Sequence, residues 1–154
     1  MLEQWLQDRA NNKILFVGIG NVLKKDDGVG VYITRHLKNG PRHQSLTVEV
    51  SIENYIGKIN SLNPDLLVLI DCMDLQGQPG TWDLLAAERI SGCTTNTHNI
   101  SLDRVTELFD PPAHILGIQP LDITLGEGLS EGVLATANML IRTINRFESV
   151  SPIH

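Results

Sequence analysis

The sequence has few cysteines and no long apolar stretch. Only two of its 154 residues are cysteines, Cys72 and Cys93, which is too few for a disulfide scaffold and lacks the close pairing of a metal knuckle. We expect both to be reduced, and for Cys72 burial as a small apolar residue is favoured over a role as a nucleophile. The longest apolar runs, residues 14–17 and 66–70, are far shorter than the roughly 20 residues of a membrane span.

Basic residues are also scarce. The chain has 12 Lys and Arg against 18 Asp and Glu, a net charge of −6 that repels nucleic acid at long range. Residues 1–9 contain acids and lack the basic lead and apolar run of a secretory signal, so we expect a cytoplasmic protein. The length and a hydrophobic content of 42% suit one domain over residues 1–154.

Apolar runs and helical patterns alternate along the chain. Short apolar or alternating segments predict strands at 13–18, 46–50, 66–71, 81–85 and 115–118. Apolar residues at helical spacing predict helices within 29–37, 52–62, 102–109 and 133–147. We therefore expect an α/β fold, a three-layer α/β/α sandwich with a mostly parallel sheet of about five strands. Residues 81–85 are expected to form an antiparallel edge strand.

Two acidic positions follow predicted strands. The turn at residues 18–30 contains adjacent carboxylates, Asp26 and Asp27, and Asp71 ends the apolar strand at 66–70. Ligands of open α/β sheets bind beyond the carboxyl ends of strands, and a 2-1-3 strand order would bring Asp27 and Asp71 to one crevice. Two carboxylates a few ångströms apart repel by about 4 kcal/mol at an effective dielectric constant of about 20, so the pair would share a proton or a cation.

Simpler roles exist for these acids. Helix capping is an even alternative for Asp26 and a weaker one for Asp27, because one carboxylate is enough to cap a helix. Asp74 suits a turn better than Asp71 does. We therefore favour Asp27 and Asp71 as site residues.

His98 is the histidine most suited to join them. It lies in the polar segment 95–99, whose side chains could orient an imidazole by hydrogen bonding. Its neutral ring with the two carboxylates would suit a borderline divalent metal, whereas a proton shared by the carboxylates alone would give an aspartic-protease-like dyad. The other four histidines are expected to be peripheral, or half-buried in the case of His114: His36, His43, His114 and His154.

A dinucleotide-binding loop is the competing interpretation of the first turn. Gly18 and Gly20 follow a strand as that fingerprint requires, but its third glycine would fall at Leu23. Asp26 and Asp27 would also face the pyrophosphate. We therefore rank this interpretation well below a cation site.

These motifs together resemble those of the hydrogenase maturation endopeptidases, which trim the C-terminus of the large subunit of nickel-iron hydrogenases. The similarity extends from about Lys13 to Phe147, so residues 1–12 are interpreted as an N-terminal extension. Residues 97–99 and 116–120 are most similar to the branch that processes hydrogenase 3. The motifs are Gly18-x-Gly20-Asn21, Asp26-Asp27-Gly28-x-Gly30, Leu69-Ile70-Asp71 with Asp74 and Pro79-Gly80, Thr97-His98-Asn99, and Leu116-Gly117-Ile118-Gln119-Pro120.

The resemblance implies specific roles. The family's metal ligands would fall on Asp27, Asp71 and His98, with Asp27 and Asp71 as the catalytic carboxylates. The nickel would arrive with the substrate, the precursor of a [NiFe] hydrogenase large subunit, and the isolated enzyme would be metal-free or hold another divalent metal. We expect a monomer that removes the C-terminal extension of the nickel-loaded precursor.

Some alternatives stay open. A metal-activated water or a carboxylate base such as Asp27 could carry out the hydrolysis. A module that senses nickel or binds the precursor without cutting it would use the same ligands. Residues 49–54 replace the Asp-Gly-Gly that relatives usually carry, which leaves the cognate hydrogenase open.

Overall fold

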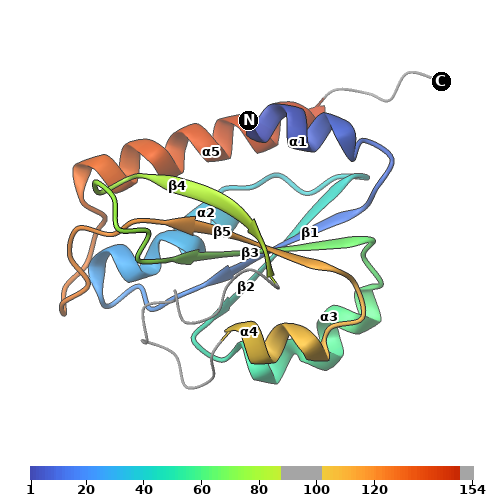
Figure 1. Ribbon diagram of the computed structural model, residues 1–154, viewed down its shortest axis with the longest axis horizontal. Coiled ribbons are helices and arrows are strands. Elements are labelled where there is room, and N and C mark those ends of the chain that lie inside the picture. The colour runs from blue at the N-terminus through green and yellow to red at the C-terminus, as the bar shows by residue number, and fades with distance from the viewer. Residues whose placement is uncertain (88–101, 150–154) are drawn as a thin grey trace.

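The computed structural model describes residues 1–87 and 102–149, which form a five-stranded sheet with helices on both faces (Figure 1). The sheet has the order β2-β1-β3-β5-β4, parallel except for β4, which pairs antiparallel with β5. The predicted fold class, the 2-1-3 order and the antiparallel edge strand are therefore confirmed. The strands are β1 (Ile14–Ile19), β2 (His43–Glu49), β3 (Leu66–Cys72), β4 (Trp82–Ala86) and β5 (Ala113–Ile118).

The helices form two layers, one packed on each face of the sheet, and in the view of Figure 1 α5 lies above the strands and α3 below them. One layer contains α1 (Leu2–Asp8), α2 (Val29–Arg35) and α5 (Glu131–Ser149). The other contains α3 (Ile56–Leu62) and α4 (Leu102–Val105). Short 3₁₀ turns adjoin these helices: η1 (Lys25–Gly28), η2 (Ile52–Tyr55) and η4 (Thr106–Leu108).

The two central strands are buried along their whole length, which explains why they are continuous apolar runs in the sequence. Alternate side chains of β1 enter different cores, because successive residues of a strand point to opposite faces. Ile14 and Phe16 pack with α1, α2 and α5, whereas Leu15 and Val17 pack with α3 and α4. None of the described helices is long and apolar enough to cross a lipid bilayer.

The segment before β1 contributes to the first of these cores. Leu2 and Leu6 of α1 are buried against α5, at 5% and 0% exposure. Residues 1–8 are therefore part of the folded domain in this chain, although the first dozen residues lie before the motifs recognised in the sequence.

Gly30 sets how closely α2 approaches the sheet. A Cβ atom at this position would collide with the carbonyl oxygen of Ile70 on β3 and lie 2.6 Å from that of Ile19 on β1. Only glycine permits this contact. The turn before α2 is thereby held against the carboxyl ends of both central strands.

His43 is buried, so the peripheral position predicted for it is wrong. It begins β2 at 2% exposure, edge-on to Phe16 and stacked on Phe147. Burial, with a smaller contribution from the positive charge of Arg42, lowers the pKa of His43 to about 4. Glu148 Oε2 lies 3.6 Å from His43 Nδ1, but this carboxylate accepts the backbone N–H groups of Arg42 and His43, and burial has the larger effect.

This shift predicts acid sensitivity. The unfolded chain takes up a proton at the ordinary imidazole pKa of 6.5 and the folded chain only near 4, so stability is lost as the pH falls between these values. From about pH 7.5 to about pH 5 the free energy of unfolding should fall by about 2 kcal/mol through this group. Urea denaturation at both pH values should show that His43→Phe removes this part of the pH dependence, whereas His36→Gln, an exposed control, does not. An unchanged pH dependence in His43→Phe would contradict the assignment.

Candidate active site

The ends of β1 and β3 meet where the sequence predicts. The two strands pair in parallel, and their pairing ends with Gly18 opposite Ile70. Asp71 follows directly and is still paired with Gly117 of β5 on the other side. The turn η1, which follows β1, brings Asp27 to the same edge. These two carboxylates therefore converge from distant parts of the sequence.

Asp27 is fully buried. The backbone N–H of Asn21 donates to Asp27 Oδ2 at 3.0 Å, and the thiol of Cys72 donates to Asp27 Oδ1 at 3.2 Å. These contacts fix the position of the Asp27 carboxylate between η1 and the end of β3. The carboxylate is therefore enclosed at the strand end and not open to solvent.

Asp71 is also buried, at 1% exposure. Its Oδ1 accepts the backbone N–H of Cys72 at 2.8 Å. Asp74, three residues later, forms the turn expected of it, because its Oδ1 accepts the N–H of Gln76. The structure therefore separates a buried acid from a neighbouring turn-forming one.

Asp27, Asp71 and Cys72 form a compact group of potential donors. One ligand atom from each lies within 4.8 Å of the others, and all three residues are buried. Two carboxylates and a thiol form a donor set suited to borderline or soft divalent metals, nickel and zinc among them. The residues thus fit the metal that the resemblance implies, and equally allow a proton to be held between the two carboxylates.

Cys72 contributes more than the sequence suggests. It is buried at 0% exposure, as expected of a small apolar residue, but its thiol also contacts Asp27. Its place directly after Asp71, at the end of a buried strand, was the available signal. The sequence interpretation weighed Cys72 only as a buried apolar residue or a nucleophile, and it missed this contact because Asp27 lies 45 residues earlier in the chain.

Asp26 has a structural role of a different kind. Its Oδ2 accepts the N–H groups of Leu121 and Asp122 and the hydroxyl of Ser130, and its Oδ1 accepts the N–H of Ser130. The N-cap residue of α2 is Gly28, and no side chain forms a capping hydrogen bond at this helix end. The capping role considered for Asp26 is therefore wrong, and this carboxylate instead holds the loop between β5 and α5.

Lys25 reinforces the same loop. Its Nζ lies 2.9 Å from Asp122 Oδ2, and its N–H donates to the carbonyl of Gly126. Hydrogen bonds from Thr124, together with Lys25, hold the pKa of Asp122 well below its usual range. The loop at residues 121–130 is thus attached to η1 through both side chains and backbone, directly beside Asp27.

His98, the third ligand predicted from the sequence, lies outside the described residues, as does Cys93. Its place relative to Asp27 and Asp71 stays a prediction. The described residues do bring the two predicted acids, Asp27 and Asp71, together. Their roles as ligands and catalytic groups stay predictions.

Comparisons with known proteins agree with this fold. No family model matches the chain. A solved [NiFe] hydrogenase maturation protease, HycI from Thermococcus kodakarensis, superposes with a TM-score of 0.83 at 27% identity, covering 97% of this chain and 99% of its own. A candidate hydrogenase maturation protease of Methanocaldococcus jannaschii is 24% identical over 159 residues, covering 93% of this chain and 94% of that relative.

A second type of maturation enzyme shares the fold. The hydrogenase maturating endopeptidase HybD from Escherichia coli matches with a TM-score of 0.71 at 22% identity, over 87% of this chain and 88% of its own. The recognition of the hydrogenase maturation proteases from sequence motifs is therefore confirmed. Because HycI and HybD enzymes both match, the hydrogenase 3 branch is not singled out.

Proposed function

We infer that this chain is a hydrogenase maturation endopeptidase, a hydrolase that removes the C-terminal extension from the precursor of a [NiFe] hydrogenase large subunit. The observation that carries this inference is the buried pair Asp27 and Asp71 at adjacent strand ends. It occurs in a fold that covers nearly the whole of a solved maturation protease. The motifs around both acids are those that suggested the family.

Nickel enters this proposal as part of the substrate. The precursor would present its bound nickel to Asp27 and Asp71, whose donor atoms with that of Cys72 lie within 4.8 Å of one another. His98 would be the further ligand. A precursor without nickel would lack the cation that these two buried carboxylates are suited to contact, which provides a test of maturity before cleavage.

The chemical step is the addition of water to one peptide bond. A water oxygen attacks the scissile carbonyl carbon, the C–N bond breaks, and one proton of the water passes to the leaving amine. In this proposal Asp27 takes up that proton first and passes it to the amine. The Asn21 N–H and the Cys72 thiol keep its carboxylate oriented. An aspartic-type mechanism of this kind is part of the proposal.

The remaining properties follow from the same assignment. The partner is a folded precursor protein, which calls for an accessible surface around the acids rather than a closed small-molecule pocket. We propose that the reaction takes place in the cytoplasm and that the enzyme is a monomer. The net charge of −6 makes nucleic acid an unsuitable partner.

Two other functions use the same turn. A non-cleaving module would bind the nickel-loaded precursor and leave it intact. A dinucleotide-binding protein would place a pyrophosphate against the turn that contains Asp26 and Asp27, and both carboxylates are buried there. Repulsion between the pyrophosphate and these carboxylates disfavours the dinucleotide-binding alternative.

Processing of a purified precursor separates these functions. Candidate large-subunit precursors, with and without nickel, are incubated with the protein, and the products are weighed by mass spectrometry. We expect one shortened product, formed only from the nickel-loaded precursor. A stable complex without a shortened product would support the non-cleaving module, and saturable NAD binding that survives His98→Ala would support the dinucleotide site.

A further inference from the structure

The surface along α2 and α5 has two hollows that the proposed cleavage reaction does not use. One, of about 540 Å³, begins at Val22 and Gly28 and continues along α2. The other, of about 370 Å³, lies between Lys38 and the second half of α5. The helices pack against each other, and side chains join them: Tyr32 bonds to Asn138, and the Lys38 N–H to Asn145. We call this surface the α2–α5 seam.

The end of the seam near η1 is apolar. Tyr32, Leu129 and Leu134 line it, and Leu134 is 36% exposed although it is a large aliphatic side chain. Lys25 also lines this hollow, and its charge is paired with Asp122. This end begins at Gly28, the residue that follows Asp27. A chain bound here would therefore lie next to the turn that contains a proposed catalytic acid.

The rest of the seam is cationic. Arg35 and His36 line the larger hollow, and Lys38, Arg142 and Arg146 line the smaller one. Arg35 is paired with Glu49, but Lys38, Arg142 and Arg146 form no ion pair with any residue that the structure describes.

No Asp or Glu lines either hollow in the described parts of the chain. The protein as a whole has a net charge of −6, so this absence of acids is a local departure from its average. The seam therefore suits a negatively charged segment whose end near η1 carries an apolar side chain.

We propose that the α2–α5 seam binds an acidic segment of the hydrogenase precursor that includes an aliphatic or aromatic anchor. The identification of this segment as part of the precursor rests on the proposed function. At a rise of about 1.5 Å per helical residue, Leu134 and Arg146 are about 18 Å apart along α5, which matches an extended segment of about five or six residues. The anchor fills the apolar end, and the acidic residues follow toward Arg142 and Arg146.

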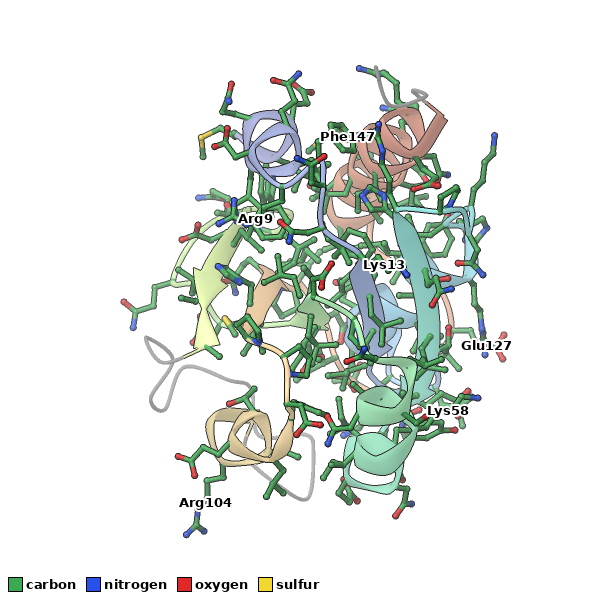
Figure 2. All side chains as sticks on the ribbon, turned by 90° about the vertical axis from the view of Figure 1, so that its right-hand side faces the viewer. Arg9, Lys13, Lys58, Arg104, Glu127 and Phe147 are labelled. Carbon is green, nitrogen blue, oxygen red and sulfur yellow. The ribbon has the colours of Figure 1, made fainter. Side chains whose placement is uncertain are left out.

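Charge reversal tests the seam directly. The probe is a fluorescein-labelled hexapeptide of alternating leucine and glutamate, titrated by fluorescence anisotropy. We expect Arg142→Glu to weaken its binding about tenfold, because an attraction is replaced by a repulsion, and the effect should shrink in high salt. Lys58→Glu is the matched control, with the same change in net charge on α3, across the sheet from α5 (Figure 2). Lys38→Glu is a second seam variant, and circular dichroism checks that all three are folded.

Two comparisons exclude other occupants. A lysine-leucine hexapeptide should not bind, and neither oligouridine RNA nor phosphatidylserine vesicles should bind more tightly than the acidic hexapeptide. Preference for RNA or vesicles, or equal losses in Arg142→Glu and Lys58→Glu, would overturn the proposal.

Processing of the precursor distinguishes the seam from the reaction. With nickel-loaded precursor, Arg142→Glu should raise KM about tenfold and leave kcat unchanged. An unchanged KM with normal cleavage would overturn the seam and leave the proposed function standing. Failure of the unaltered protein to cut any nickel-loaded precursor would overturn the proposed function and the assigned occupant together, even if the acidic hexapeptide binds.

Discussion

Asp27→Asn and Asp71→Asn will each lower the rate of precursor processing by about a thousandfold while leaving the fold intact. An asparagine keeps the shape and one acceptor oxygen of the buried carboxylate, but it removes the negative charge that a cation requires and the group that accepts a proton. The two acids lie in one group with Cys72, so the loss at either position disables the same site. Removal of one of two neighbouring like charges also relieves repulsion, and the midpoint of urea denaturation should change little.

Single-turnover cleavage of nickel-loaded precursor, followed by mass spectrometry, measures the rate. Asp74→Asn is the matched control, since it makes the same chemical change three residues after Asp71 in a turn. It should cleave at the normal rate. Normal cleavage by both Asp27→Asn and Asp71→Asn would show that the site has been assigned to the wrong residues.

The fold could be predicted because buried parallel strands are distinctive in the sequence. β1 and β3 are covered on both faces, so their residues are continuously apolar, and the ends of the runs mark the sheet edge. Asp71 interrupts such a run. The strand order alone places polar groups that follow the carboxyl ends of neighbouring strands, which is why the sequence could pair Asp27 with Asp71.

The surroundings of these acids could not be predicted in the same way. The partners of Asp26 are about 95 to 104 residues away, in a loop without apolar periodicity. The burial of His43 depends on packing against Phe147 from the last helix. A linear pattern reports the periodicity of one element, whereas these contacts depend on how loops and helices close over the sheet.

Asp26→Ala will destabilise the protein by about 4 to 5 kcal/mol, a large effect for one substitution. The Asp26 carboxylate accepts hydrogen bonds from four donors, three of them backbone N–H groups, and its side chain is fully buried. Alanine would leave these donors without their acceptor, and each hydrogen bond to a charged group contributes about 1.5 to 3 kcal/mol before the loop relaxes or water enters. Urea denaturation measures the change.

Graded variants separate this role from catalysis. Ser130→Ala removes only the hydroxyl donor to Asp26 Oδ2 and should cost about 1 kcal/mol, and it stays measurable if Asp26→Ala fails to fold. Asp26→Asn should lie between them, because its amide nitrogen cannot accept the bonds made by one carboxylate oxygen. A loss below about 1 kcal/mol in Asp26→Ala would contradict the anchoring role. With Asp27→Asn losing cleavage and Asp26→Ala losing stability, the two adjacent acids divide the tasks of reaction and loop attachment.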